Sequence, residues 1–233
     1  MDSVHIESKA TMPPVRTAPA ARTHYRHGDL RRALLQAGIE LARAGGPDAV
    51  VLREATRRAG VVPNAAYRHF ASRQALLRAV RAAALSALAA AMEAELAALP
   101  PGGSPVEHAR ARLRAVGSGY LRFAQQEPGL FRTAFAAADA PLAEQPEQPE
   151  QPEQPERAGP GGLDPFELLG AALDGLVAAG VLPAERRRHA EYLAWSAVHG
   201  LATLALDGPL RRLTAPQAVE VAERLLAMVE QGL

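Results

Sequence analysis

Several side chains between positions 60 and 73 are of the types that contact nucleic acid. Asn64 and Arg68 can hydrogen-bond to the edges of adenine and guanine in the major groove. Tyr67 and His69 can donate to phosphate oxygens, and such contacts position a protein on DNA without reading its sequence. The predicted DNA contacts are Arg53, Pro63, Asn64, Ala65, Tyr67, Arg68, His69 and Arg73.

Three predicted helices would position these side chains. Apolar residues recur at helical spacing over 28–45, and two short helices follow at about 52–59 and 63–70. Gly60 supplies the turn between the two short helices. Short helices joined in this way beneath an amphipathic helix are typical of a helix-turn-helix, in which the second short helix enters the major groove.

The residues around this turn also carry a family resemblance. One segment resembles the TetR family of bacterial transcriptional regulators. It reads Gly60-Val61-x-Pro63-x-x-x-Tyr67-Arg68-His69-Phe70-x-Ser72-Arg73-x-x-Leu76-Leu77. This resemblance covers roughly residues 28–78. It implies an N-terminal three-helix DNA-binding domain, a helical ligand-binding and dimerisation domain, and usually a repressor that a small molecule releases. Near the C-terminus, Trp195-Ser196-Ala197-Val198-His199-Gly200 resembles the Trp-x-x-x-His-Gly segment of one C-terminal subclass of the family.

Three residues depart from the family pattern. Val62 stands where a serine commonly caps the recognition helix and touches phosphate, and Ala65 stands where threonine is frequent. Arg73 stands where a lysine commonly contacts the DNA backbone, and it keeps the positive charge. Losing an N-cap costs about 1 kcal/mol, which tertiary packing can offset. We therefore expect DNA binding with some individual contacts changed.

Composition and charge narrow the class of protein. The 233 residues are 48% apolar, enough for one large or two small globular domains, and they include no cysteine, which excludes disulfide scaffolds, zinc fingers and thiol nucleophiles. Residues 1–80 hold 13 Lys and Arg against 6 Asp and Glu, whereas residues 81–233 hold 13 against 19. This asymmetry indicates an anionic partner for the first part, either nucleic acid or a membrane surface. The predicted helix-turn-helix favours double-stranded DNA.

Signals for export or membrane insertion are not evident in the sequence. The N-terminus lacks an apolar signal core, and the longest stretch without Asp, Glu, Lys or Arg, Tyr192 to Leu206, is 15 residues. We expect a cytoplasmic protein that does not bind membranes.

The sequence divides into a disordered basic arm (1–26), a DNA-binding domain (27–78) and a helical regulatory and dimerisation domain (79–233). The last contains four Glu-Gln-Pro repeats, for which we expect a disordered linker over 138–162. Capping signals and apolar periodicity predict the remaining helices at about 72–99, 104–126, 128–137, from 165, 183–207 and from 215. No alternating strand pattern is present. The expected fold is all-α, with an N-terminal three-helix helix-turn-helix domain followed by a helical bundle.

The largest apolar side chains of the middle helices are candidates for an effector pocket. They are Met92, Tyr120, Phe123, Phe131, Phe135, Trp195 and His199. A small apolar effector could bind among them, but ordinary core packing is the favoured explanation of each residue. The sequence predicts no metal site and no cofactor.

Two stripes on the C-terminal helices are candidates for a homodimer interface. They are Leu193, Ala197, Gly200 and Leu204 on one helix, and Ala218, Ala222, Leu225 and Val229 on the next. A further stripe, which includes Tyr192, is assigned to the protein's own interior. Periodicity also allows all of these residues to complete a monomer core, whereas the family resemblance favours a dimer. A twofold dimer would require a palindromic operator.

Three other classes of function compete with DNA binding. An enzyme is not expected, because the sequence has no Gly-x-Ser-x-Gly, phosphate loop, His-Glu-x-x-His or carboxylate pair beside a histidine. Membrane attachment is disfavoured because the basic arm lacks an apolar face. A helical protein-interaction adaptor that has lost specific DNA binding stays open, supported by Val62 and Ala65.

Overall fold

The computed structural model describes residues 27–136 and 157–233, and within these ranges the chain forms helices and no strand. The predicted all-α fold is confirmed. The α-helices are α1 (His27–Gly45), α2 (Leu52–Arg58), α3 (Pro63–Ala66), α4 (Arg73–Ala97), α5 (Pro105–Gln126), α6 (Pro128–Phe135), α7 (Pro165–Ala178), α8 (Ala190–Leu206) and α9 (Ala215–Gly232). Three short 3-10 helices connect them, η1 (Pro47–Ala49), η2 (Ala184–Arg186) and η3 (Pro209–Arg212).

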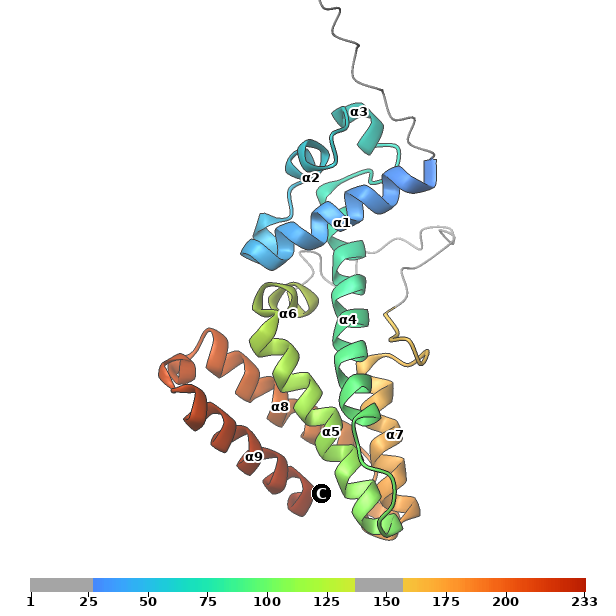
Figure 1. Ribbon diagram of the computed structural model, residues 1–233, viewed down its shortest axis with the longest axis vertical. Coiled ribbons are helices and arrows are strands. Elements are labelled where there is room, and N and C mark those ends of the chain that lie inside the picture. Colours follow the sequence, from blue (N-terminus) through green and yellow to red (C-terminus); the bar gives the residue numbers. More distant parts are fainter. Residues whose placement is uncertain (1–26, 137–156) are drawn as a thin grey trace, which may run out of the picture.

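Helix α4 joins the two parts of the molecule. Helices α1, α2 and α3 form one end, and α4 runs from them into a bundle with α5 to α9 (Figure 1). Among the described residues α4 is the one helix long and apolar enough to cross a membrane. Because it packs against α1, α5, α6 and α7, we interpret it as the central core helix of the fold.

The predicted helix starts are confirmed where they depend on local capping. The Ser72 hydroxyl accepts from the Ala75 amide at 3.1 Å and begins α4. The reciprocal capping boxes that begin α5 and α9 are present, with Glu107 bonded to the Ser104 amide and Gln217 to the Thr214 amide. Each cap satisfies backbone groups that the first helical turn leaves unpaired.

Two predicted helices were too long. The recognition helix α3 ends at Ala66, and the next residues continue as a turn in which the Phe70 amide bonds to the Ala66 carbonyl at 2.9 Å. Helix α8 begins at Ala190 rather than near residue 183. His189 takes a left-handed conformation with φ of 65°, which interrupts a right-handed helix.

The segment before α7 is ordered where a disordered linker was predicted over 138–162. Residues 1–26 and 137–156 lie outside the described residues, so the basic arm and the repeats stay predictions. Residues 157–162 instead lie against α4, with the Ser86 hydroxyl donating to the Ala158 carbonyl at 2.7 Å and the Gly161 amide donating to the Glu93 carboxylate at 3.0 Å. A Cβ at Gly159 would lie 2.7 Å from the same carboxylate. The linker prediction was wrong at this end because composition does not reveal tertiary hydrogen bonds.

Helix α6 connects the end formed by α1, α2 and α3 to the bundle. Its N-terminus meets the end of α1 so closely that a Cβ at Gly129 would lie 2.2 Å from the Ala42 carbonyl oxygen. Beside this contact, the Arg43 guanidinium binds the Glu127 carboxylate at 3.0 Å. Farther along α6, Arg132 binds Asp207 at the end of α8 at 2.6 Å. A displacement of α6 would therefore act on both α1 and α8.

Candidate functional site

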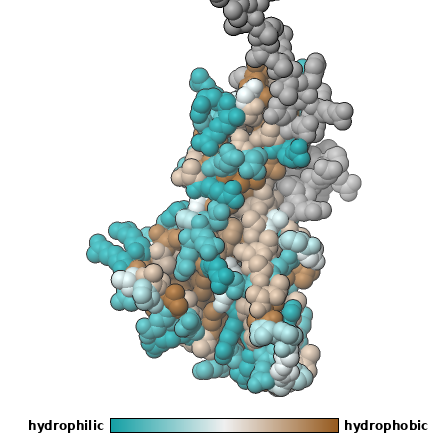
Figure 2. Space-filling view, viewed as in Figure 1, coloured by the Kyte–Doolittle hydropathy of each residue, from teal (hydrophilic) through white to brown (hydrophobic). Residues whose placement is uncertain are grey.

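The helix-turn-helix predicted around Gly60 is present. Gly60 has φ of 68°, a conformation that glycine adopts without steric cost, and the Val61 amide closes the turn on the Thr56 carbonyl at 3.1 Å. Ala66 and Phe70 are buried and anchor α3 against the domain core. Hydrophilic side chains cover much of this end of the molecule on the face shown in Figure 2.

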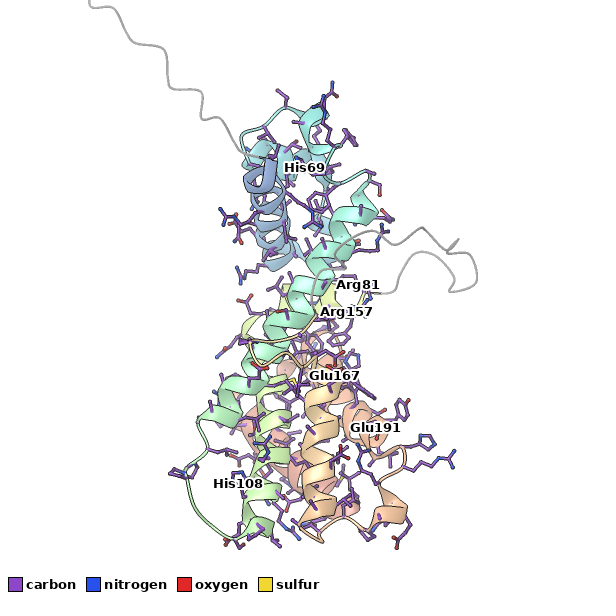
Figure 3. All side chains as sticks on the ribbon, turned by 90° about the vertical axis from the view of Figure 1, so that its right-hand side faces the viewer. His69, Arg81, His108, Arg157, Glu167 and Glu191 are labelled. Carbon is purple, nitrogen blue, oxygen red and sulfur yellow. The ribbon has the colours of Figure 1, made fainter. Side chains whose placement is uncertain are left out.

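The recognition helix presents its predicted contact residues unequally. Asn64, Tyr67 and Arg68 are exposed, and Tyr67 reaches 57% exposure. Ala65 and His69 are partly buried, and Figure 3 places His69 at this end of the molecule. Pro63 is the first residue of α3. The turn therefore leaves the amide of Asn64 and the phenol of Tyr67 open to a partner.

Four arginines near the turn fall into two groups. Arg57 and Arg58 bind the carboxylate of Glu54 on the same helix at 2.7 and 3.3 Å. The hydrogen bond from Arg57 is the largest cause that lowers the pKa of Glu54 to about 2, and Arg58 adds to it. Arg53 and Arg68 are exposed and form no ion pair with the described residues. The predicted DNA contacts include Arg53 and Arg68 and neither Arg57 nor Arg58, but the ion pairs that neutralise Arg57 and Arg58 depend on side-chain geometry, which the sequence does not show.

The structure changes the interpretation of Arg73, predicted as a DNA contact. Its Nε donates to the Val50 carbonyl and its Nη2 to the Pro47 carbonyl, each at 2.9 Å. A weaker contact of 3.9 Å joins it to Asp48. Two of its donors are thus used to hold the segment before α2 against the start of α4. Arg73 therefore positions the domain, and a contact of its remaining donors with DNA stays a prediction.

Five predicted effector residues form one aromatic cluster inside the bundle. They are Tyr120, Phe131, Phe135, Trp195 and His199, with ring centroids 4.8 to 6.4 Å apart. The Tyr120 hydroxyl and His199 Nδ1 share a hydrogen bond of 2.7 Å. Burial raises the pKa of Tyr120 and lowers the pKa of His199, so both groups are held neutral. Residues 79 positions apart thereby share a hydrogen bond within the aromatic cluster.

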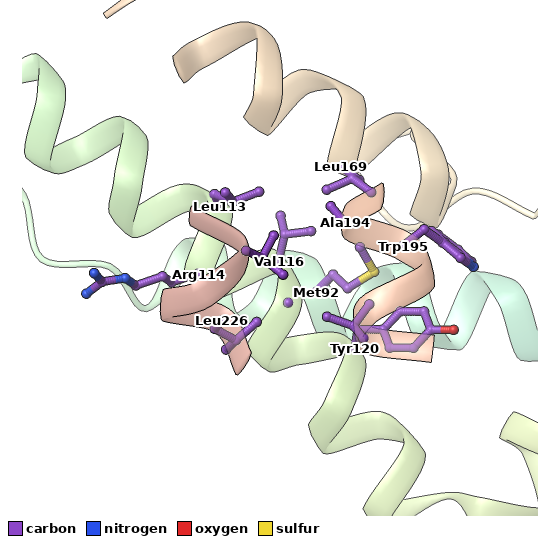
Figure 4. Close-up of a pocket in the computed structure, with 12 residues that line it drawn as sticks. Met92, Leu113, Arg114, Val116, Tyr120, Leu169, Ala194, Trp195 and Leu226 are labelled. Carbon is purple, nitrogen blue, oxygen red and sulfur yellow. The ribbon is translucent and has the colours of Figure 1, made fainter. Parts of the chain in front are cut away.

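A small cavity adjoins this cluster. Its volume is about 20 Å³, and Met92, Tyr120 and Trp195 are among its lining residues (Figure 4). None of the other lining residues was predicted as an effector residue. They are Leu113, Arg114, Val116, Gly117, Leu169, Ala194, Val198, Leu226 and Val229. Phe123 is buried but lies outside both the cluster and the lining. A cavity of this size holds about one water molecule, so this cavity has no room for a larger ligand in the present conformation.

The two predicted dimer stripes differ in their surroundings. On α8, Leu193 and Leu204 are 66% and 44% exposed, and a Cβ at Gly200 would meet nothing within 4 Å. This stripe forms an apolar surface without a partner among the described residues. Tyr192, assigned from the sequence to the interior, is exposed instead.

The predicted stripe on α9 packs mainly within the chain itself. Leu226 of this helix approaches α5 so closely that a Cβ at Gly117 would lie 2.3 Å from it. Three of the predicted residues, Ala222, Leu225 and Val229, pack against the core, and Ala218 joins α5 and α8 residues around a second small cavity. All four residues are only partly buried within the chain, so their assignment to the dimer interface stays a prediction. The exposed apolar residues of α9 are Val219 and Met228.

Comparison with protein families identifies both parts of the chain. Residues 113–229 match the model of the tetracyclin repressor-like C-terminal domain, and residues 34–80 match the model of bacterial regulatory proteins of the tetR family. The chain belongs to the TetR family. It is accordingly a DNA-binding transcriptional regulator with a helix-turn-helix domain. Both matched domains are those of transcriptional regulators.

Solved structures similar to this TetR-family chain cover nearly its whole length. A protein of unknown function from Rhodococcus sp. RHA1 is 28% identical over 91% of this chain and 99% of its own, with a TM-score of 0.65. FadR from Bacillus subtilis, solved in complex with stearoyl-CoA, is 12% identical over 87% and 98%, with a TM-score of 0.57. The TetR-family regulator PfmR from Thermus thermophilus is 21% identical over 86% and 98%, with a TM-score of 0.51. No curated protein sequence matches this one.

Proposed function

We propose that this TetR-family regulator is a cytoplasmic repressor that binds a palindromic operator as a homodimer and is released by a small apolar effector. The proposal assigns residues 1–26 to a basic arm, 27–78 to the DNA-binding domain and 79–233 to the regulatory and dimerisation domain. It also assigns the C-terminal domain to the Trp-x-x-x-His-Gly subclass, since Trp195 and His199 share one cluster.

The exposed face of α3 is the observation that carries the proposal. Asn64 and Arg68 are its candidates for base contacts, and Tyr67 and Arg53 for phosphate contacts. We assign His69 to the same face, with Pro63 and Ala65 allowing close approach of α3 to the bases. The absence of ion pairs at Arg53 and Arg68 within the described residues supports these roles, since their charge is not neutralised inside the protein.

The apolar stripe of α8 is the proposed centre of the homodimer. Leu193 and Leu204 are exposed, and the partly buried Ala197 and Gly200 between them are small enough to allow a second backbone to approach. The exposed Met228 of α9 could extend this face. Two recognition helices related by a twofold axis reach successive major grooves when they lie about 34 to 36 Å apart, so the operator should be a palindrome.

The proposed effector site is the aromatic cluster and the cavity beside it. The cavity lining is apolar apart from the Tyr120 hydroxyl, the Trp195 indole N–H and Arg114, and the Arg114 guanidinium points away from the other labelled side chains (Figure 4). Because the cavity now holds about one water, an effector has to separate the helices around it. Near-complete release from DNA requires that the effector bind the DNA-incompetent arrangement roughly 10⁴-fold more tightly. FadR, of similar fold, was solved with stearoyl-CoA, which supports a site for an apolar molecule in this bundle.

Selection of bound fragments from random double-stranded DNA tests the proposal. We expect an enriched palindrome with two half-sites, and we expect Asn64→Ala to select a different sequence. Tyr67→Ala should weaken binding similarly on all sequences, because a phosphate contact carries no sequence information. DNA binding without enrichment of any sequence would contradict the repressor proposal, and an absence of DNA binding would favour the adaptor.

The oligomeric state is tested separately by light scattering after size exclusion. Leu193→Arg should convert the dimer to a monomer that keeps its helical content, because the side chain is already exposed. Val106→Arg is the control, since this valine is 39% exposed at the far end of the bundle, at the start of α5. A Leu193→Arg protein that stays dimeric would contradict the proposed interface.

A further inference from the structure

Val62 is the most exposed of the large apolar side chains in the described part of the chain. Its side chain is 70% exposed, whereas the next, Leu193, is 66% exposed and belongs to the proposed dimer surface. An exposed apolar side chain forms no hydrogen bond with water, and isolated apolar side chains are common on protein surfaces. Val62 is notable because of its position in the DNA-binding domain.

The backbone of Val62 is fixed relative to the recognition helix. The residue directly precedes α3, and its carbonyl accepts from the Ala65 amide at 3.0 Å. Burial of Ala66 and Phe70 holds the same turn against the domain core. Val62 therefore moves with Asn64 and reaches DNA whenever α3 does.

The chemistry of the side chain restricts what it can contact there. An isopropyl group neither donates nor accepts a hydrogen bond, so it cannot bind phosphate, cap α3 or bond to a base edge. The major-groove code contains one apolar group, the C5-methyl group of thymine. We propose that Val62 is a specificity-determining residue that contacts a thymine methyl group in each half-site of the operator. This inference rests on the proposed sequence-specific DNA binding.

The expected effect is modest and measurable. Removing one buried methyl group from an apolar contact weakens binding about fourfold. A valine that stays in solvent when the protein binds DNA would give no change at all. The two possibilities are therefore separated by a single methyl group on the DNA.

Deoxyuridine scanning of the selected operator measures this contact directly. Each thymine is replaced in turn by deoxyuridine, which removes the C5-methyl group and keeps both hydrogen-bonding edges of the base. For the full-length wild-type protein we expect one thymine per half-site whose replacement raises the Kd about fourfold. For Val62→Ala the Kd on the unmodified operator should rise similarly, and the penalty at that one position should disappear.

Two further variants serve as controls. Val51 precedes α2 as Val62 precedes α3 and is 43% exposed, so Val51→Ala removes the same atoms from the same domain and should keep the deoxyuridine penalty. Val62→Thr keeps the shape and replaces one methyl group by a hydroxyl, so it should reduce the penalty even if Val62→Ala folds poorly.

The outcomes distinguish this inference from the proposed function. An enriched operator on which no thymine methyl affects wild-type binding overturns the role of Val62 and leaves the repressor proposal intact. A penalty that persists in Val62→Ala and Val62→Thr overturns it as well. A selection that enriches no sequence overturns both.

Discussion

The contact between α1 and α6 gives a sharp test of how the DNA-proximal end is held on the bundle. A Cβ added at Gly129 would lie 2.2 Å from the Ala42 carbonyl oxygen and 2.4 Å from the Arg43 carbonyl oxygen, whereas ordinary contacts begin at 3.4 Å. Both opposing atoms belong to backbone. Gly129→Ala therefore cannot be accommodated by a change of rotamer, and α6 has to move away from α1 by about 1 Å.

The cost follows from two opposing effects. Inserting a methyl group into a packed contact costs roughly 1 to 3 kcal/mol, and the upper end applies because rigid backbone opposes it. Alanine is favoured over glycine in a helix by about 1 kcal/mol. We expect a net loss of about 2 kcal/mol in the free energy of unfolding. For a chain of this length that lowers the Tm by roughly 4 to 8 °C.

Gly175→Ala is the matched control. Gly175 lies within α7, and a Cβ there would meet nothing within 4 Å. This variant should gain up to about 1 kcal/mol from helix propensity alone. Thermal unfolding followed by circular dichroism at fixed protein concentration compares the two variants with the wild type. If Gly129→Ala melts at or above the wild-type temperature while Gly175→Ala rises as expected, the α1–α6 contact is not as close as described.

Two further predictions concern titration and buried charge. Burial lowers the pKa of His199 below its usual 6.5 in the folded protein. As the pH falls, the imidazole of the unfolded chain is therefore protonated before that of the folded chain. The contribution of neutral His199 to the free energy of unfolding is complete above about pH 6.5 and is lost as the pH decreases toward the folded pKa. The unfolding free energy of His199→Gln, measured by urea denaturation from pH 7.5 to 5.5, should vary less with pH than that of the wild type or of the exposed control His108→Gln, and parallel profiles would refute this. The Glu230 side chain is 2% exposed and binds both Arg110 and Arg114, so Arg110→Ala with Arg114→Ala leaves a buried carboxylate unpaired and should cost about 3 to 5 kcal/mol. Glu230→Ala should cost less because both arginines are 42% or more exposed and can be hydrated, and equal or reversed costs in urea denaturation would contradict this order.

The features that the sequence predicted correctly depend on neighbours along the chain. Ser72, Ser104 and Thr214 begin their helices through bonds to residues three positions away. Gly60 makes its turn through its own backbone conformation. Interactions of this range are the same in any fold, so the all-α class and the helix-turn-helix could be predicted without a structure.

Site residues were predictable only in part. Asn64 and Tyr67 were predicted to face DNA, and both are exposed, whereas Ala66 and Phe70 of the same segment are buried. The pairing of Tyr120 with His199 was not, although both were candidates, because 79 residues separate them. Periodicity shows that each helix has a buried face and does not show which helix packs against it.

Tertiary structure decided the features that depend on distant partners. Arg73 could be identified as a cation near the recognition helix, but the carbonyls that bind it come from 23 and 26 residues away. Glu93 fixes a glycine segment 68 residues later that composition assigned to a disordered linker. The apolar stripe of α9 packs on α5, while the stripe of α8 stays exposed, although both have the same helical spacing. Helical period is a local property of the backbone, whereas the surface that buries each face depends on how all the helices pack together.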